Sequence, residues 1–201
     1  MVFKSIALVK AGRAGTILPT NFKEVNADGL QHHLKDVKED QMYCVVGESM
    51  SPEGIHTDNI LVAEKIESKD DVKNILKQGD FVIIRIPKNK DDIVDIDLQR
   101  TLSLKIRKYI TVLDLNVPYE QLWNDVQDVD DLSKIESSKD IFKLKYDQAI
   151  KSIPPNDRSE VLLSITYTAE HGREYSFHSR KFLYAKVVFY IDSNKKKIIL
   201  K

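Results

Sequence analysis

The sequence predicts a mainly β protein that is interrupted by one helical stretch. Three observations support this fold class. From residue 41 onward, compact apolar runs alternate with turn-forming residues, which is the pattern of short strands. Between residues 116 and 158 the apolar residues recur instead at the spacing of an α-helix. From residue 160 to the end, strand-like runs return.

The composition is that of an ordinary globular protein. The chain has 201 residues, of which 42% are hydrophobic and 31% charged, and its formal net charge is zero. A neutral chain has no bulk attraction to nucleic acid or to a membrane surface, so we expect neither as a partner. No metal constellation, phosphate loop or dinucleotide motif is visible, and we expect no metal and no cofactor.

The single cysteine and the N-terminus bear on location. One cysteine cannot form an intramolecular disulfide, and the run MYCVV predicts that Cys44 is a buried strand residue rather than a nucleophile. No apolar run approaches the roughly 18 residues that cross a membrane. The N-terminal run SIALV is too short for a signal peptide. We therefore expect a cytoplasmic protein.

In chain order, the first half predicts an arm followed by strands. Residues 1–40 show no regular pattern and are expected to form an N-terminal arm, whereas residues 41–201 form the folded domain. A short helix is expected over 68–79, where Ser68 or Asp70 caps the start and Gly79 follows the end. Apolar runs predict strands over 42–46, 59–66 and 81–86, and one or two more over 98–115.

The second half begins with the helical stretch. Pro118 suits a first helical turn, and a weaker helix over 137–153 ends before Pro154. The apolar stripe of the first helix either packs on the β core or forms a surface for a partner. The stripe consists of Tyr119, Leu122, Trp123, Val126, Val129 and Leu132. The later strands are expected over 160–169, 175–179, 181–192 and 198–201.

The stretch VVGESMSPEG, residues 45–54, places a serine directly after a predicted strand. A serine nucleophile needs a base for its proton and donors for the oxyanion that forms. Gly47 allows a sharp bend, so the backbone amides of Ser49 and Glu48 can form an oxyanion hole. Met50 would pack beneath the turn as an apolar anchor. The alternative is that Ser49 is only a turn residue.

Histidines and lysines are the candidate bases for Ser49. A lysine can serve if apolar surroundings favour its neutral form. In the predicted strand LSLKIRKYI, Lys105 lies between two apolar residues, whereas Lys108 is expected to be an exposed charge. The simpler alternative for Lys105 is an outward-facing strand lysine. The histidines show no setting typical of a Ser-His-Asp triad; they are His32, His33, His56, His171 and His178.

The order of these features resembles the LexA/UmuD-like family of serine–lysine autopeptidases, whose core fold is shared with type I signal peptidases. The segment GESM matches the first family motif, QGD precedes a strand as in a later motif, and Lys105 takes the place of the family's lysine. The segment AKVVFYI takes the place of the final strand. The resemblance covers residues 1–115 and 160–201, and it implies a LexA/signal-peptidase-like β-fold.

The chain departs from the family pattern in three places. Asp58 and Asn59 stand where the family has a turn glycine and a second aspartate, although aspartate also tolerates a left-handed turn position. The family's Lys-Arg pair is broken by Ile106. The stretch 116–158 has no counterpart in compact members, so we expect it to be a helical insertion.

Members of the family cut their own chain upstream of the domain, often between alanine and glycine. The segment VKAGRAG offers two such bonds, Ala11–Gly12 and Ala14–Gly15. A small alanine fits a narrow pocket, and a glycine lets the backbone approach the nucleophile closely. An ordinary flexible arm is the alternative. We favour a cleavage segment and lean slightly to Ala14–Gly15.

The resemblance implies a serine endopeptidase that cleaves itself, in cis or in trans, within a DNA-damage (SOS-type) or mobile-element stress response. Ser49 would attack, and Lys105 would act first as general base and then as acid. We expect a homodimer, with the chain's own arm as substrate and without direct binding of DNA or membranes. The alternative is a dormant fold, kept as a regulatory module that binds a protein partner through residues 116–158.

Overall fold

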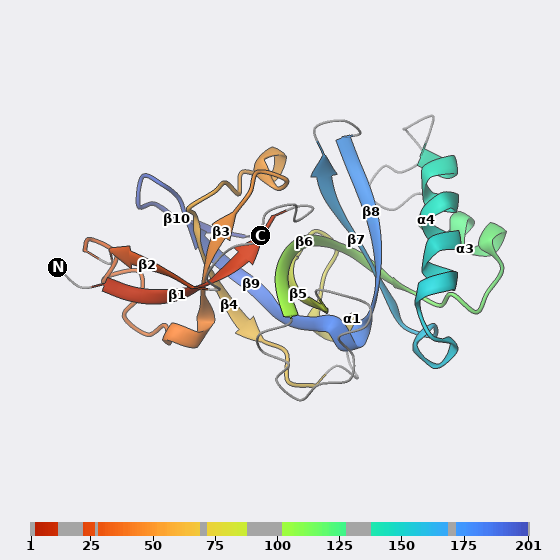
Figure 1. Ribbon diagram of the computed structural model, residues 1–201, viewed down its shortest axis with the longest axis horizontal. Coiled ribbons are helices and arrows are strands. Elements are labelled where there is room, and N and C mark those ends of the chain that lie inside the picture. Colours follow the sequence, from red (N-terminus) through yellow and green to blue (C-terminus); the bar gives the residue numbers. More distant parts are fainter. Residues whose placement is uncertain are drawn as a thin grey trace.

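The computed structural model describes residues 3–11, 22–26, 28–68, 72–87, 102–127, 138–168 and 172–200. These residues form a ten-stranded mixed sheet and a few helices, so the protein is mainly β (Figure 1). The strands are β1 (Phe3–Lys10), β2 (Phe22–Asn26), β3 (Met42–Val46), β4 (Ile60–Lys65), β5 (Phe81–Pro87), β6 (Leu102–Leu113), β7 (Val161–Thr168), β8 (Gly172–Ser179), β9 (Leu183–Ile191) and β10 (Lys197–Ile199). The helices are α1 (Val72–Ile75), α3 (Tyr119–Val126) and α4 (Ser138–Ser152).

Six strands of the sheet close into a ring. They follow one another in the order β1-β3-β4-β9-β5-β6, and a parallel pairing of Lys10 with Lys105 joins β6 back to β1. β1 also runs parallel to β3, with Lys10 opposite Val46. One core cluster fills the inside of this ring with apolar side chains from all six strands; it includes Val9, Val45, Leu61, Ala185, Ile83 and Ile106. The ring therefore defines an inner and an outer face for each strand.

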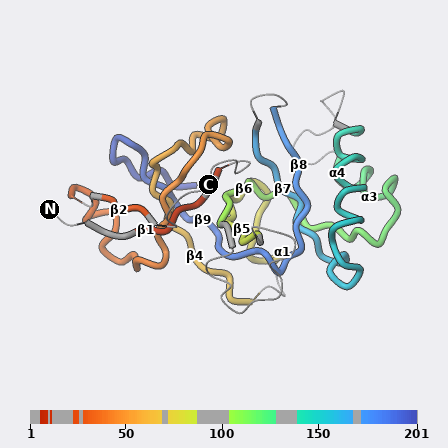
Figure 2. Tube along the Cα trace, viewed as in Figure 1, coloured from red at the N-terminus to blue at the C-terminus, as the bar shows by residue number. Residues whose placement is uncertain are grey.

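The hairpin of β7 and β8 extends the sheet beyond β6, and the helical insertion covers it. In Figures 1 and 2, α4 runs beside β8, at the end of the molecule opposite β1 and β2. Phe142 of α4 is fully buried there. Its ring centroid lies 5.5 Å from that of Trp123 in α3 and 5.3 Å from that of Phe177 in β8.

The apolar stripe of the insertion packs on the core of the chain itself. Its described members are all buried; they are Tyr119, Leu122, Trp123 and Val126. Val129 and Leu132 lie outside the described residues. Of the two alternatives for the stripe, the structure therefore shows packing against the β core.

The prediction that residues 1–40 are irregular is wrong. β1 lies within the ring, and its side chains Ile6 and Val9 are 1% and 0% exposed. β2 pairs antiparallel with β1 along its length. The apolar run of β1 is short, and its pairing partners β3 and β6 lie far away in the sequence, so no local pattern announced this strand.

The expected strands after residue 41 are present, with ends that shift by a few residues. The helix expected over 68–79 is much shorter, and α1 covers Val72–Ile75, while residues 69–71 lie outside the described part. Cys44 is a buried strand residue of β3, as predicted, and burial raises the pKa of its thiol. That environment makes it a poor nucleophile.

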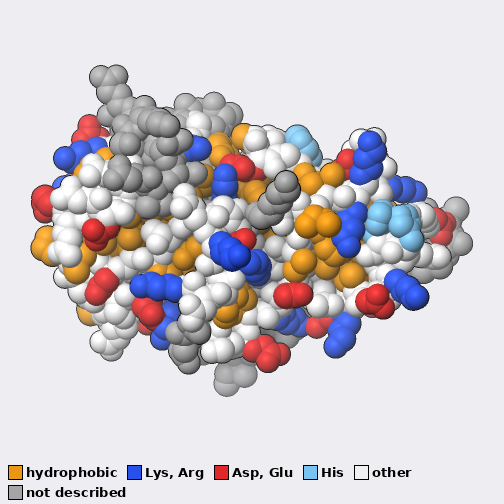
Figure 3. All heavy atoms as spheres, turned by 180° about the vertical axis from the view of Figure 1, so that it is seen from behind, with side chains coloured by type: hydrophobic (Ala, Val, Ile, Leu, Met, Phe, Trp, Pro, Cys, Tyr) orange, Lys and Arg blue, Asp and Glu red, His pale blue; other side chains and the backbone are white. Residues whose placement is uncertain are grey.

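The surface shows mixed charge. On the face seen in Figure 3, basic and acidic side chains are interspersed with apolar groups, without a broad area of one charge sign. Among the described helices, none is long and apolar enough to cross a membrane.

Candidate active site

The turn after β3 has the backbone geometry that the sequence predicted. Gly47 has a φ of 99°, in the region that favours glycine, and the chain bends there. Asp58 adopts a φ of 69°, so an aspartate occupies a left-handed turn position there. Met50 is 0% exposed and fills the ring together with Ile55, which confirms its expected role as an anchor.

The end of β1 docks against this turn. The Ala11 amide donates to the Val46 carbonyl at 2.9 Å, and the Ala11 side chain is buried. A Cβ built on Gly47 would lie 2.4 Å from the Ala11 carbonyl oxygen, so only glycine allows this approach. The carbonyl of the candidate bond Ala11–Gly12 therefore lies against Gly47, which precedes Ser49 by two positions in the sequence. Gly12, Ala14 and Gly15 lie outside the described residues.

The backbone carbonyl of Ser49 is bound by β7. That oxygen accepts the Tyr167 amide at 3.0 Å and the Thr166 hydroxyl at 3.4 Å, at the end of β7 where β6 and β7 no longer pair. Within the described residues, the Ser49 hydroxyl forms no hydrogen bond, and the amides of Ser49 and Glu48 donate none. These are the groups that a nucleophile and an oxyanion hole require.

A partly buried ionic network connects the turn to β6 and β7. Lys108 donates to both carboxylate oxygens of Glu53, at 2.9 and 3.0 Å, and the Tyr167 hydroxyl donates to the same carboxylate. Burial opposes the charge of Glu53, but the hydrogen bonds from Tyr167 and Lys108 outweigh it and lower the pKa of the carboxyl. The prediction of an exposed Lys108 is therefore wrong, because its side chain is only 18% exposed.

Neighbouring side chains of β6 point to opposite faces of the sheet, so Lys105 does not point into the ring, where Met50 lies. Ile106 lies opposite Ile83 and points into the ring with Met50, so Lys105 and Arg107 project from the outer face. Lys105 is half-buried and lies opposite Ile84, which is 0% exposed. Its backbone pairs with Lys10, the residue before Ala11. The structure thus brings the Lys105 backbone close to the docked strand and turns its side chain away from the interior of the ring.

Arg107 is a second cation on this outer face. It is 4% exposed, and burial lowers the pKa of its guanidinium to about 10, although nearby Glu174 acts in the opposite direction. The group stays charged at neutral pH and cannot serve as a base. Neither Arg107 nor the network residues Glu53 and Tyr167 followed from the sequence, because their positions depend on which strands become neighbours.

The described histidines do not contact the Ser49 hydroxyl. His56 Nδ1 lies 3.1 Å from a carboxylate oxygen of Glu48, a pair that is mostly exposed. His178 Nε2 is buried on β8, and burial lowers the pKa of its ring to about 3, with further lowering by Arg107 and Lys105. His171 lies outside the described residues.

We expect His178 to make stability depend on pH. The unfolded ring titrates near 6.5 and the folded ring near 3, so the unfolded state binds more protons between these values. The free energy of unfolding should therefore fall with decreasing pH below 6.5, by up to about 1.4 kcal/mol per pH unit. Urea unfolding of His178→Gln beside the wild type measures this contribution as the difference between their slopes. The exposed His32→Gln is the control, and equal slopes for wild type and His178→Gln would contradict the expectation.

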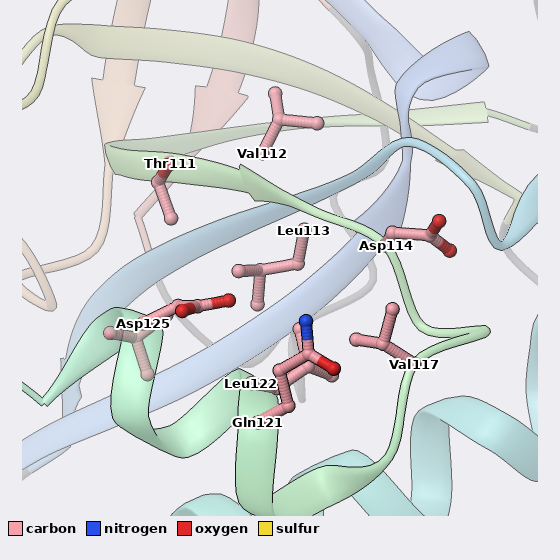
Figure 4. Close-up of a pocket in the computed structure, with 9 residues that line it drawn as sticks. Thr111, Val112, Leu113, Asp114, Val117, Gln121, Leu122 and Asp125 are labelled. Atoms are coloured by element: carbon pink, nitrogen blue, oxygen red, sulfur yellow. The ribbon is translucent and has the colours of Figure 1, made fainter.

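A separate pocket of about 300 Å³ lies between the end of β6 and α3 (Figure 4). Its floor is apolar, with Leu113 and Leu122, and Asp114, Gln121 and Asp125 line its rim. It contains none of the residues at the Ser49 turn. The pocket is therefore not part of the candidate active site.

Neither a protein-family model, nor a curated protein, nor a solved structure matches the chain. The function is therefore inferred from the site alone.

Proposed function

We propose that the chain is a self-cleaving serine endopeptidase of LexA/signal-peptidase-like fold, and that Ser49 cuts the bond between Ala11 and Gly12. The observation that carries this proposal is the docking of the chain's own strand at the Ser49 turn. Ala11 ends β1, binds the Val46 carbonyl and places its own carbonyl against Gly47. An extended segment held by main-chain hydrogen bonds presents its carbonyl beside a nucleophile in a defined geometry.

The chemical steps use the groups at this turn together with Lys105 of β6. Ser49 Oγ attacks the Ala11 carbonyl carbon while neutral Lys105 takes the hydroxyl proton. The amides of Glu48 and Ser49 donate to the oxyanion. The carbon–nitrogen bond then breaks, and the lysine returns the proton to the Gly12 amine. Water hydrolyses the remaining ester between Ala11 and Ser49.

Lys105 is the base in this proposal because the other two cations of β6 are unsuitable. Lys108 is engaged by both carboxylate oxygens of Glu53, and Arg107 keeps its charge. Lys105 projects from the outer face of β6, as Arg107 does. Its backbone is paired with Lys10, directly before the bond to be cut.

A dormant fold that serves as a binding module is the second candidate, and the position of β1 favours it. Ile6 and Val9 are buried, and β1 pairs with β2, β3 and β6. A cut after Ala11 would therefore sever a strand of the ring rather than release a free arm. A partner at the insertion would meet exposed side chains such as Leu144, because the described part of the apolar stripe is buried.

Intact mass, measured under denaturing conditions after incubation from neutral to alkaline pH, tests the proposal. We expect the wild type to lose residues 1–11, faster at higher pH because a lysine base must lose its proton. Denaturation is needed because the cut strand would remain bound in the ring. Ser49→Ala and Lys105→Ala should stay intact, whereas the neighbouring Ser51→Ala should behave as the wild type.

Two results would contradict the peptidase assignment. Cleavage that persists in Ser49→Ala would show another nucleophile. A wild type that stays intact at every pH would favour the dormant module. Loss of residues 1–14 in the wild type alone would keep the peptidase and move the bond to Ala14–Gly15.

A further inference from the structure

Arg107 is a buried cation with almost no hydrogen-bond partners. A guanidinium has five N–H donors. Here Nη1 donates to the Ile106 carbonyl at 2.7 Å, and within the described residues Arg107 forms no other hydrogen bond and no ion pair. Its side chain is nevertheless 4% exposed. Glu174 favours the charged form of Arg107, and its carboxylate forms an ion pair with Lys145 at 2.7 Å.

Two more buried polar atoms on the same face lack a partner. Ser164 Oγ and His178 Nε2 are buried, and neither forms a hydrogen bond in the described part of the chain. Ser164 lies opposite Tyr109, two residues along β6 from Arg107 and therefore on its face. His178 lies opposite Leu162, two residues along β7 from Ser164. The three side chains thus form a diagonal series across β6, β7 and β8.

Buried polar groups of this kind destabilise the folded protein unless a ligand or water forms hydrogen bonds with them. Each buried polar group without a partner loses its hydration, and a buried charge without a counter-charge loses much more. Most buried polar atoms in folded proteins therefore have a partner, and exceptions point to bound water or an ion. Arg107 carries a positive charge at neutral pH. The missing partner should therefore be negative.

The free edge of the guanidinium defines the kind of anion. Nη1 is bound to the Ile106 carbonyl, whereas Nε and Nη2, which form the adjacent edge, make no hydrogen bond within the described residues. Two parallel N–H groups on this edge match two oxygens of a carboxylate or phosphate group. The Ser164 hydroxyl and the His178 ring supply further donors of the kind that bind such oxygens.

We propose that the outer face of β6, β7 and β8 binds a small oxyanion, held by the Nε–Nη2 edge of Arg107 with Ser164 and His178 beside it. This site does not depend on the proposed peptidase activity. It assigns Arg107 the role of an anion anchor rather than of a structural core residue.

Thermal unfolding in the presence of anions tests the site. The probes are inorganic phosphate, which is tetrahedral, and acetate, which is planar, each compared with chloride at equal ionic strength. We expect one of the two oxyanions to raise the melting temperature of the wild type in a saturable way. In Arg107→Met the midpoint of this effect should shift at least tenfold to higher concentration. The control Arg85→Met, in which a surface cation stacked on Tyr184 is removed, should keep the wild-type midpoint.

A melting temperature that responds to ionic strength alone, or a saturable effect that is equal in Arg107→Met, would overturn the proposal. Arg107→Met removes a buried charge that forms no ion pair within the described residues, so it should be at least as stable as the wild type in chloride. If this variant does not fold, the Arg Nε–Hε resonances of the wild type decide the question. One buried arginine resonance that moves in the same phosphate or acetate range supports the site, and none that moves refutes it.

Discussion

Gly47→Ala is expected to destabilise the protein by about 2–5 kcal/mol. Part of this loss is the strain of placing an L residue at a φ of 99°. The larger part is steric, since the new Cβ would lie 2.4 Å from the Ala11 carbonyl oxygen. That oxygen belongs to the backbone of a ring strand and cannot rotate away as a flexible side chain would. The docked strand must therefore move, and with it the hydrogen bond between Ala11 and Val46.

Gly79→Ala separates these two contributions. Gly79 also has a positive φ, 91°, but a Cβ there would meet nothing within 4 Å. This variant should therefore lose only the conformational part, about 1–2 kcal/mol. Urea unfolding of the two variants beside the wild type measures the difference. Equal losses would show that the end of β1 does not press on Gly47, and the main support for self-cleavage at Ala11 would fall.

Local sequence patterns predicted most of this fold because most of its strands are compact apolar runs between turn residues. The run MYCVV became β3 with the expected ends, and Pro118 marked the start of α3. β1 escaped prediction because its parallel pairing partners are distant in the sequence: β3 pairs with its second half, and β6 meets it at Lys10. A strand in that position shows no clear alternation of apolar and polar residues.

The features of the candidate site also fall into two groups: those set by adjacent residues, which the sequence predicted, and those set by strand pairing, which it did not. The bend at Gly47 and the anchor Met50 followed from adjacent residues, and the structure has both. The direction of the Lys105 side chain depends on the pleat and on its partner Ile84, which no single strand sequence reveals. Tyr167, which binds the Ser49 carbonyl, comes from a strand that follows the helical insertion. Residues that are brought together by pairing between strands distant in the sequence could be identified only in the structure.

The helical insertion should prove to be part of the folded core, and Phe142→Ala tests this. Phe142 is 0% exposed, and its ring packs against aromatic rings from both α3 and β8, with centroid distances of 5.5 Å to Trp123 and 6.1 Å to Tyr175. Removing a buried phenyl ring costs about 3–5 kcal/mol, through lost apolar burial and the cavity left behind. An appended helix pair with its own weak packing would melt alone and leave the sheet intact.

Leu144→Ala is the matched control on the same helix, because Leu144 is 57% exposed and buries little surface. We expect it to change the free energy of unfolding by no more than about 0.5 kcal/mol. The measurement is urea unfolding followed both by Trp123 fluorescence, which reports on the insertion, and by far-ultraviolet circular dichroism, which reports on the whole chain. Coincident transitions that shift together in Phe142→Ala would place insertion and ring in one cooperative unit. A shift of the fluorescence transition alone would show that the helices unfold separately, and the insertion would then be free to act as an exchangeable binding element.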